Sequence, residues 1–413
     1  MRVLAVTNLY PNPYQPTRAT FNRQQLRALH TSHPVRVISP ISWTEELPVR
    51  LKQGKKLPRN RRVTLDQLTV AHPRYLFTPK LFRSRYGNFY RRSIRRSFEQ
   101  ALAEFHPDIV FAPWAYPDGW AAVKLAHQHN LPCVIKVHGC DVLAGGKGLK
   151  HHPGRYKPTV EALREADAVV TVSQHLADTC IDLGVEPERV RVVYDGIDDT
   201  LFHPGPQSEA RDLLGLDTTD PIILFVGQLV DVKGIDVLIK ACAVLAKETQ
   251  KFRTILIGEG PLRDALYKQI TQVGLHNNVR LFGAKPHEHL PHYFRAATVF
   301  VLPSHSEGVP CVLLESAACG TPFVASRVGG IPEIGHLIES RLVQPNNPEQ
   351  LAQAIADLVA YRAGNPNLPA PPMRTHTDAA KEIAELFHEL LGSPDRSKPL
   401  DDRTRIRPKM IQN

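Results

Sequence analysis

The sequence predicts an α/β protein in which two doubly wound, parallel-sheet domains follow one another along the chain. A length of 413 residues suits two domains. Short β-branched runs alternate with longer helical patterns, which is typical of parallel sheets covered by helices. A polar stretch rich in proline and glycine, residues 203–208, separates two halves with the same alternation, and we interpret it as the linker.

The first domain is expected over residues 1–202. Its strand-like runs cover 3–7, 35–38, 109–112, 133–137, 168–172 and 190–194. Its helical patterns cover 21–28, 86–105, 120–129, 160–166 and 175–183. These short runs and longer patterns follow one another as strand–helix units do.

The second domain is expected over residues 203–376. Its strand-like runs cover 222–226, 254–257, 279–282, 299–302, 323–325 and 342–343, and its helical patterns cover 237–248, 262–273, 310–319 and 351–359. A last helix is expected over 377–391, and the charged tail 392–413 is expected to be disordered because it has little to bury. Ligands of such sheets bind beyond the carboxyl ends of the strands, so a cleft between two facing domains is the predicted site.

The composition is that of an ordinary globular chain, with 42% hydrophobic and 22% charged residues. No apolar run approaches the length that spans a bilayer, and the first residues turn polar too soon for a secretory signal. The six cysteines are scattered without a C-x-x-C pair, so neither zinc nor a disulfide framework is expected. These features predict a cytoplasmic protein.

The net charge of +10 is concentrated in residues 50–96, which hold fifteen Lys or Arg and a single acid, Asp66. A solvated face is one interpretation of this basic segment. The others are peripheral contact with an anionic membrane at its inner face, a phosphorylated acceptor, and nucleic acid. Nucleic acid is not expected, since no helix-turn-helix, zinc or aromatic RNA-binding signature accompanies the charge.

Two glutamates eight residues apart, Glu307 and Glu315, form the first candidate site. Glu307 is expected on a turn after a strand, and Glu315 about two turns into a helix. Pro310 suits the first position of that helix, and the free N–H groups after it form an anion site. A phosphate cradle with a carboxylate on either side would suit a nucleotide-sugar, whereas the competing interpretation is a surface pair without function.

Loops after other strands carry further candidates. Gly227 permits close ligand approach, and Lys233 places an ammonium near it unless it is an ordinary surface lysine. In the first half, His138 and Asp141 follow an apolar run, and a histidine at a strand's carboxyl end can hydrogen-bond a substrate hydroxyl. Asp195 lies in an Asp-Gly-Ile-Asp turn, for which simple turn chemistry is the competing interpretation.

Several enzyme classes are disfavoured because their motifs are missing from the sequence. There is no dinucleotide G-x-G-x-x-G, no P-loop, no G-x-S-x-G elbow and no histidine cluster with metal-ligand spacing.

Taken together, these residues resemble the family 4 glycosyltransferases of the GT-B fold, over about residues 1–391. The similarity is most specific over 222–335, where motifs occur in the family's order: Gly227, Lys233-Gly234, Gly258-Glu259-Gly260, Glu307-x7-Glu315 and Gly329-Gly330-x-Pro-Glu333. Two first-half motifs resemble the branch that builds bacterial surface polysaccharides, the teichuronic-acid type: Tyr116-Pro117-Asp118-Gly119 and His138-Gly139-Cys140-Asp141. The implied fold has two Rossmann-like domains, with the C-terminal helix returning to the first.

The resemblance implies retaining transfer from a nucleotide-diphosphate sugar to a saccharide or lipid-linked acceptor, without a metal or other cofactor. Glu307 would hold donor-sugar hydroxyls, Lys233 would meet the diphosphate, and His138 would face the donor sugar. Glu315 would take the ribose hydroxyls. The other implied donor-binding residues are Gly227, Gln228, Ala284, Lys285, Gly308, Val309, Cys311 and Val312. The residues implied for the acceptor or the cleft are Asp141, Trp114 and Tyr116.

Two positions depart from the family's pattern. Gln228 stands where the family commonly has arginine, so a hydrogen-bond donor is kept while a charge and a bidentate fork are lost. Ala19 stands where a glycine usually lies beside the donor phosphate, and its methyl group could restrict backbone approach.

Other functions stay open at this point. Within the fold they are a nucleotide-sugar epimerase and a phosphorylase, which would carry pyridoxal phosphate on a lysine. A catalytically degenerate binder is supported only by Gln228 and Ala19. A retaining glycosidase needs carboxylates roughly 5 Å apart, closer than a loop and a later helical position suggest.

Overall fold

The computed structural model describes residues 1–54, 57–79, 85–143, 149–216, 219–248, 251–365 and 368–392. Residues 393–413 of the predicted tail, and residues 55–56 and 80–84 of the basic segment, lie outside this set. Two compact units make up the described part of the chain: unit 1 contains Met1–Asp195 and helix α14, His376–Gly392, and unit 2 is Gly196–Thr375.

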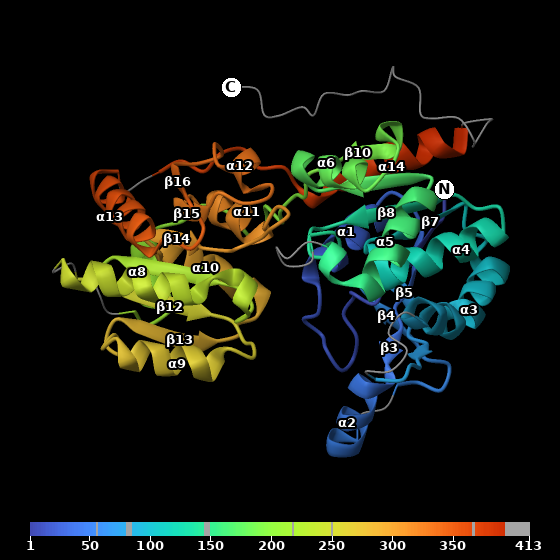
Figure 1. Ribbon diagram of the computed structural model, residues 1–413, viewed down its shortest axis with the longest axis horizontal. Coiled ribbons are helices and arrows are strands. Elements are labelled where there is room, and N and C mark those ends of the chain that lie inside the picture. The colour runs from blue at the N-terminus through green and yellow to red at the C-terminus, as the bar shows by residue number, and fades with distance from the viewer. Residues whose placement is uncertain are drawn as a thin grey trace. The chain divides into compact units, whose positions relative to one another are not determined.

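Unit 1 is built on an eight-stranded sheet with the order β10-β9-β8-β7-β1-β2-β5-β4 (Figure 1). Its strands are β1 Val3–Val6, β2 Val35–Ile38, β4 Arg62–Leu65, β5 Leu68–Ala71, β7 Ile109–Ala112, β8 Cys133–Val137, β9 Ala168–Thr171 and β10 Val190–Val192. Neighbouring strands are parallel, except that β4 runs antiparallel to β5. A separate pair joins β3, Ile41–Ser42, to β6, Arg74–Tyr75.

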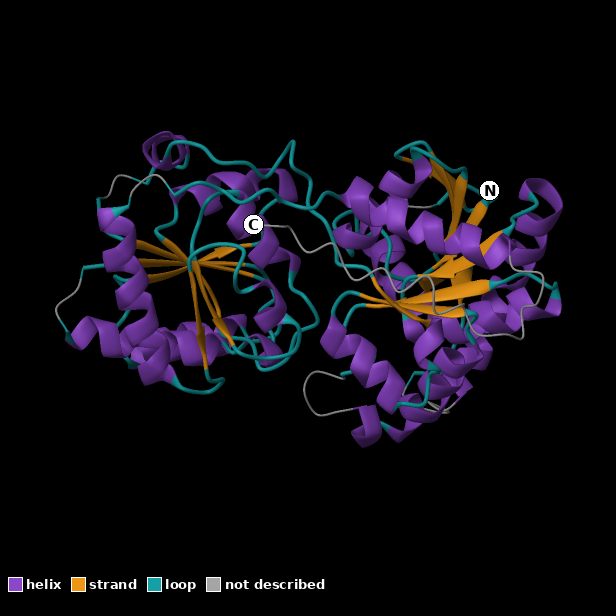
Figure 2. Cartoon of the chain, turned by 90° about the horizontal axis from the view of Figure 1, so that it is seen from above, coloured by secondary structure: helices purple, strands orange, loops and turns teal. Residues whose placement is uncertain are grey.

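Helices cover both faces of this sheet (Figure 2). They are α1 Thr20–His30, α2 Trp43–Gln53, α3 Tyr86–Phe105, α4 Trp120–Gln128, α5 Pro153–Glu165, α6 Gln174–Asp182 and α14 His376–Gly392, with short helical turns at Ala115–Gly119, Leu149–His151 and Pro187–Arg189. Helix α14 packs on α1 and belongs to the same core, where the rings of Phe387 and Phe111 lie 5.5 Å apart. The predicted return of the last helix to the first domain is therefore confirmed.

Unit 2 has a six-stranded, all-parallel sheet with the order β13-β12-β11-β14-β15-β16. Its strands are β11 Ile222–Val226, β12 Arg253–Ile257, β13 Val279–Gly283, β14 Val299–Leu302, β15 Phe323–Ser326 and β16 Ser340–Val343. Its helices are α7 Gln207–Leu213, α8 Ile235–Lys247, α9 Arg263–Gln272, α10 Leu290–Ala296, α11 Cys311–Ala318, α12 Ile331–Ile334 and α13 Pro348–Gly364, with 3-10 turns at Asp231–Lys233 and His287–His289. The predicted doubly wound parallel sheets are thus confirmed in both halves.

The strand order of unit 2 reverses direction between β11 and β14. Strands that follow β11 in sequence add on one side of it, and β14 begins the other side. In open parallel sheets a ligand crevice lies outside the carboxyl ends of the strands at such a reversal. The loops after β11 and β14 carry Lys233 and Glu307, respectively, so the topology alone brings the two predicted residues to the same edge of the sheet.

The boundary between the units differs from the expected linker at 203–208. Residues 196–202 belong to unit 2, because the backbone of Ile197 bonds that of Arg374 at 2.9 Å and Arg295 donates to the carbonyl of Leu201 at 3.3 Å. The ring of Phe202 also packs 6.1 Å from that of Phe294. The proline- and glycine-bearing stretch therefore leads into α7 instead of joining the units.

Candidate active site

Two loops of unit 2 bring Lys233 and Glu307 into direct contact. The loop after β14 is pinned to the 3-10 turn after β11, because the N–H of His305 donates to the carbonyl of Val232 at 2.8 Å. Lys233 Nζ then donates to Glu307 Oε1 at 2.6 Å, and Ser304 Oγ donates to the same oxygen at 2.7 Å. The side chain of Lys233 is still 21% exposed, so two of its three N–H donors can serve a further ligand.

Glycines at positive φ make this approach possible. Gly329 has a φ of 55°, and a Cβ there would lie 1.8 Å from the carbonyl oxygen of Glu307. The next residue, Gly330, donates its N–H to the carbonyl of Gly308 at 2.9 Å. Gly234 has a φ of 62°, and a Cβ there would lie 2.0 Å from the carbonyl oxygen of Pro303. The backbone around Glu307 is therefore held by contacts that a side chain would break.

Helix α11 begins directly after the Glu307 loop. Its first residue is Cys311, so Pro310 occupies the capping position and not the first helical position that the sequence suggested. No side chain caps this end, and the first turn carries no acidic residue. Cys311 and Val312 are half-buried, whereas Gly308 and Val309 are buried. An uncapped helix N-terminus beside a lysine attracts an anion.

Glu315 lies about one turn into α11, not the two turns expected, because the helix starts at Cys311 and has 3.6 residues per turn. It is 7% exposed. Its Oε1 accepts a hydrogen bond from His287 Nε2 at 2.9 Å, and its buried Oε2 has no partner among the described residues. A buried carboxylate oxygen of this kind is an acceptor suited to a ligand hydroxyl.

His287 is a site residue that the sequence did not reveal. It lies in the 3-10 turn after the β13 loop, and its ring packs 5.1 Å from that of Phe202. Burial opposes its charged form, but the hydrogen bond that His287 donates to Glu315 and the charges of the nearby carboxylates outweigh burial and raise the pKa of His287 above its usual value. The imidazolium form is thereby favoured beside Glu315.

The other predicted donor-binding residues lie on neighbouring loops of unit 2. Gly227 directly follows β11, and its N–H donates to the carbonyl of Ile257 at 2.9 Å. Gln228 follows it and is exposed. Ala284 is exposed in the loop after β13, and the Nζ of Lys285 lies 5.8 Å from the ring centroid of Phe282. These positions agree with a shared edge of the sheet, while their contact with a donor stays a prediction.

Unit 1 holds His138 tightly at the carboxyl end of β8. Asp141 Oδ1 accepts the N–H groups of His138 at 3.1 Å and of Gly139 at 2.9 Å, which closes the loop. The imidazole ring packs 4.7 Å from the ring of Phe21. Burial lowers the pKa of His138 to about 3, so the ring is neutral at physiological pH.

The predicted acceptor residues differ in exposure. Asp141 is fully buried, and burial raises its pKa to about 6. Tyr116 is also buried, and its hydroxyl accepts the N–H of Gly87 at 2.8 Å. Trp114 is half-buried. Asp141 and Tyr116 therefore bond backbone groups of unit 1, and an acceptor role for these three residues stays a prediction.

The described part of the chain contains neither a metal-ligand cluster nor a membrane-spanning helix. There, no group of three or more His, Cys, Asp or Glu side chains is placed to hold a metal ion. Within the same residues, every helix is too short or too polar to cross a membrane.

Comparison with known families gives two matches that together span most of the chain. The model described as Glycosyltransferase Family 4 matches residues 19–201, and the one described as Glycosyl transferases group 1 matches residues 206–368. The D-inositol 3-phosphate glycosyltransferase of Thermobispora bispora is 31% identical over 305 residues, covering 68% of this chain and 70% of that protein. The protein of Bacillus subtilis named as a teichuronic acid biosynthesis glycosyltransferase, TuaC, is 27% identical over 403 residues, covering 94% and 98%.

Solved structures share the fold at lower sequence identity. Sucrose-phosphate synthase from Thermosynechococcus elongatus superposes with a TM-score of 0.77 and 21% identity, over 94% of this chain and 98% of that one. Anabaena HepE, solved in complex with UDP and glucose, superposes with a TM-score of 0.70 and 18% identity, over 94% and 99%.

Proposed function

Because the chain belongs to glycosyltransferase family 4, we propose that it transfers a sugar from a nucleotide-diphosphate donor to a saccharide or lipid-linked acceptor. The chain is a glycosyltransferase of the GT-B type by its family and its fold. The proposed role is in cell-surface polysaccharide or glycoconjugate biosynthesis, supported by the similarity to the teichuronic acid protein. A nucleotide-sugar donor is supported by HepE, which binds UDP and glucose.

The observation that carries the proposal is the cluster of Lys233, Glu307, the α11 N-terminus and Glu315 in unit 2. Breaking the bond between sugar and diphosphate loads negative charge on the diphosphate. Lys233 and the helix N-terminus would stabilise that charge. Glu307 Oε1 is taken by Lys233 and Ser304, which leaves its Oε2 to accept donor-sugar hydroxyls. Glu315 Oε2 would accept a ribose hydroxyl.

The stereochemical outcome and the metal requirement are parts of the same proposal. We expect transfer with retention of the anomeric configuration, as the resemblance implies. We also expect transfer without a metal, because Lys233 and the α11 N-terminus would together stabilise the charge of the leaving diphosphate. His138 is assigned to the donor sugar by the resemblance. The anomeric proton coupling of the first product, measured by NMR, tests retention. Turnover measured after EDTA treatment tests metal independence.

The central experiment combines a donor screen with a transfer assay. UDP-, GDP- and ADP-sugars are tested by thermal shift, since a true donor raises the melting temperature by mass action. The stabilising donor is then incubated with candidate acceptors, and the glycoside is detected by mass spectrometry. Donor binding followed by an epimerised sugar would support the epimerase alternative, and binding without any product would support the degenerate binder. Absence of binding to any nucleotide-sugar would contradict the proposal.

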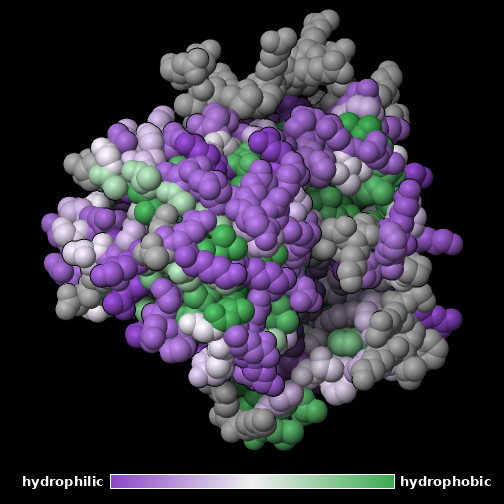
Figure 3. Space-filling model, turned by 60° about the vertical axis from the view of Figure 1, so that its left-hand side comes forward, coloured by the Kyte–Doolittle hydropathy of each residue, from purple (hydrophilic) through white to green (hydrophobic). Residues whose placement is uncertain are grey.

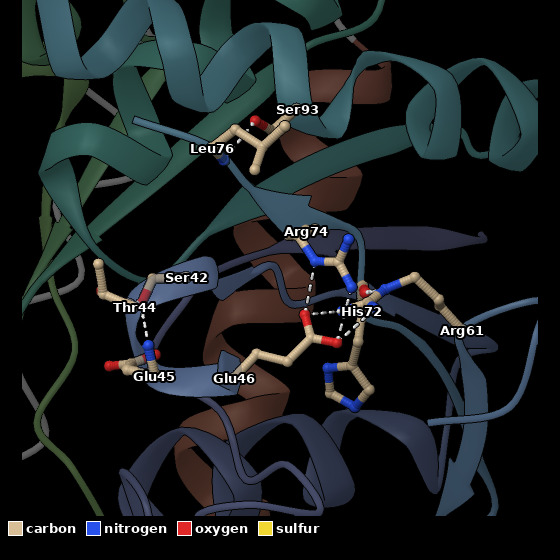
Figure 4. A network of polar contacts seen from close by, with 9 residues as sticks. All are labelled: Ser42, Thr44, Glu45, Glu46, Arg61, His72, Arg74, Leu76 and Ser93. Atoms are coloured by element: carbon tan, nitrogen blue, oxygen red, sulfur yellow. Dashed lines mark hydrogen bonds and ion pairs between the residues drawn. The ribbon is translucent and has the colours of Figure 1, made fainter. Parts of the chain in front are cut away.

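We further propose that the acceptor is met at an anionic membrane surface, through helix α2 and the basic segment. Part of the predicted charge is neutralised within unit 1: Arg61 and Arg74 both bond Glu46, which is buried (Figure 4), and Arg62 bonds Glu104. The Glu46 cluster fixes α2 at the lower end of unit 1 in Figure 1. Figure 3, which is turned about the vertical axis from the view of Figure 1, shows hydrophobic side chains at its lower edge.

Helix α2 combines exposed leucines with exposed arginine. Leu47 and Leu51, one turn apart, are 45% and 75% exposed, and Arg50 between them is exposed. Leu76 is 58% exposed beside Phe77, whose carbonyl accepts a bond from the Trp43 indole at 2.8 Å. Apolar side chains flanked by cations fit the interface of an anionic bilayer.

The membrane proposal is tested with vesicles of phosphatidylglycerol and phosphatidylcholine. Leu47→Ser together with Leu51→Ser should lower vesicle binding at least tenfold, because each inserted leucine contributes about 1.5–3 kcal/mol. Leu213→Ser, at a 66% exposed leucine of unit 2, is the matched control and should leave binding unchanged. Equal binding by the wild type and the double variant would refute this docking surface without affecting the transferase proposal.

A further inference from the structure

A buried lysine lies in the strand that leads to His138. Lys136 belongs to β8 and is 0% exposed, although a charged side chain in the protein interior is costly unless it is paired. Its Nζ donates to Asp195 Oδ1 at 2.6 Å, and Asp195 is itself only 9% exposed. Side chains two residues apart on a strand point to the same face, so Lys136 and His138 share one side of β8.

Asp195 lies against both of these side chains. It follows β10, and β9 separates β10 from β8 in the sheet. While Oδ1 accepts from Lys136, Oδ2 lies 3.8 Å from His138 Nδ1, which is close enough for strong electrostatic interaction but too long for a hydrogen bond. The aspartate that the sequence suggested as a turn residue therefore connects the buried lysine to the histidine.

The other described neighbours of His138 hold the ring in place, but they do not determine which ring nitrogen carries the proton. Phe21 packs on the ring, and Asp141 bonds the backbone N–H but not the imidazole. His138 Nε2 is buried and has no hydrogen-bond partner among the described residues. Among the described residues, the Lys136–Asp195 pair lies against the Nδ1 side of the ring and can decide which ring nitrogen carries the proton.

We propose that Lys136 and Asp195 are positioning residues that keep His138 neutral, with the proton on Nδ1 and the lone pair of Nε2 presented to a ligand. The inference rests on the proposed function, in which His138 meets the donor sugar. The Asp195 carboxylate favours a proton on the nitrogen that faces it. The Lys136 ammonium cancels the charge of that carboxylate, which alone would draw a second proton onto the ring.

The electrostatics of the neighbouring groups agree with this arrangement. Burial is the largest cause that lowers the pKa of His138, the Lys136 ammonium lowers it further, and Asp195 raises it. The pKa of Asp195 is itself lowered: burial opposes this, but the neighbouring positive charge, chiefly the Lys136 ammonium, outweighs burial. Asp141 is the other acid that contacts the His138 loop. Removing Lys136 alone should therefore raise the pKa of His138, and removing Asp195 alone should lower it.

A double-mutant cycle separates positioning from a merely structural role. Lys136→Met and Asp195→Asn are each expected to lower kcat roughly tenfold or more, with little change in the KM for the donor, because each changes the protonation or tautomer of the ring that meets the reacting sugar. Lys136→Met should also add a new ionisation to the pH profile of kcat. The double variant has no buried charge at the pair, so it should regain the melting temperature of the wild type but not its kcat.

Each outcome of the cycle decides the question. Recovery of wild-type kcat in the double variant would show that the pair only stabilises the fold, and would overturn the inference. Lys124→Met is the control, since it removes a partly exposed lysine of the same unit that pairs with Glu161 at 2.6 Å, and it should leave kcat unchanged.

A spectroscopic readout keeps the inference testable apart from turnover. In the wild type at pH 7, nitrogen-15 NMR of labelled histidine should show His138 as the neutral Nδ1–H tautomer. A wild type that makes no glycoside but shows this tautomer would sink the proposed function and leave the positioning intact. An Nε2–H tautomer or a charged ring would overturn the positioning even in an active enzyme.

Discussion

Each unit of this protein carries a lysine bonded to a carboxylate at 2.6 Å, and the two pairs differ in what water can reach. In unit 2 the Lys233 side chain is 21% exposed beside Glu307, whereas in unit 1 the Lys136 side chain is sealed at 0% beside Asp195. An ammonium that keeps free donors can bind a phosphate directly. A sealed ammonium acts only through its field on neighbouring groups, so similar geometry supports two different tasks.

The largest expected effect tests the open pair. Lys233→Ala and Glu307→Ala should each lower kcat/KM for transfer by about 10²–10³, because charge that faces the developing diphosphate is lost. The rates are measured with saturating acceptor, and folding is checked by thermal melting.

Lys240→Ala is the matched control for the open pair. Lys240 is an exposed lysine of α8 that pairs with Asp236 at 3.0 Å, and its loss should leave the rate within twofold of the wild type. Near-normal rates in Lys233→Ala would mean that the Lys233–Glu307 pair is only a structural contact. The two lysine–carboxylate pairs would then not differ in function as proposed.

The glycine that supports the open pair should be the next most sensitive position. Gly329→Ala places a methyl group 1.8 Å from the Glu307 carbonyl at a φ of 55°, so we expect a loss of about 2–4 kcal/mol in the free energy of unfolding together with lost transfer. Gly364→Ala, at the end of α13 with open space around it, should change the free energy of unfolding by less than about 1 kcal/mol. Urea titrations measure both, and equal effects would contradict the tight approach.

Glu315, which is bonded to His287, is the residue proposed to bind the nucleotide in the same site. Glu315→Gln should weaken nucleotide binding by roughly tenfold or more in calorimetry, because a hydrogen bond to a charged acceptor contributes about 1.5–3 kcal/mol. A variant that binds as the wild type does would remove Glu315 from the ligand contacts.

The His287–Glu315 bond also predicts a pH dependence of stability. Since the pKa of His287 is raised in the folded state, the stabilisation is fully present below the ordinary pKa of 6.5 and is lost as pH rises through the folded pKa. The loss in unfolding free energy caused by His287→Gln should therefore be larger at pH 6 than at pH 8.5. His289→Gln, an exposed histidine of the same turn, is the control, and a pH-independent difference would contradict the bond.

The smallest expected effect concerns Ala19 in unit 1, where an alanine has the positive φ that glycines have in the site loops of unit 2. Ala19 caps α1 with a φ of 46°, a left-handed conformation that costs an alanine about 1–2 kcal/mol. Ala19→Gly should stabilise the protein by about 0.5–1 kcal/mol, after the added freedom of the unfolded chain is subtracted. Ala103→Gly, at an exposed position of α3, should instead destabilise it by about 1 kcal/mol. Urea titration of both variants checks these opposite signs.

Local patterns predicted most of the fold because each strand and helix carries its own signal. The helix predicted over 86–105 begins and ends at the observed residues, and the strands of unit 2 were placed within a few residues. The elements between Ile41 and Tyr75 were missed. Helix α2 contains Pro48, which interrupts its helical pattern. Strands β4 and β5 lie toward one edge of the sheet and lack the unbroken buried apolar run that marks the central strands.

The sequence predicted site residues where they belong to one short motif, but it did not predict contacts between residues far apart in the chain. Glu307 and Glu315 lie on one loop and helix, so their spacing was visible in the sequence. The contact from Ser304 to Glu307 spans three residues, but the one from Lys233 spans 74 and depends on the strand order. His287 and Asp195 were not assigned a role because their partners are 28 and 59 residues away in the chain.

The last helix of the chain has a consequence for how the protein is made. Ile383, Leu386 and Phe387 of α14 complete the core of unit 1, whose other residues are translated before unit 2. We therefore expect the core of unit 1 to stay incomplete, with apolar surface exposed, until unit 2 has been translated. Unit 2 is continuous in sequence and can fold first, so the order of folding runs opposite to the order of synthesis.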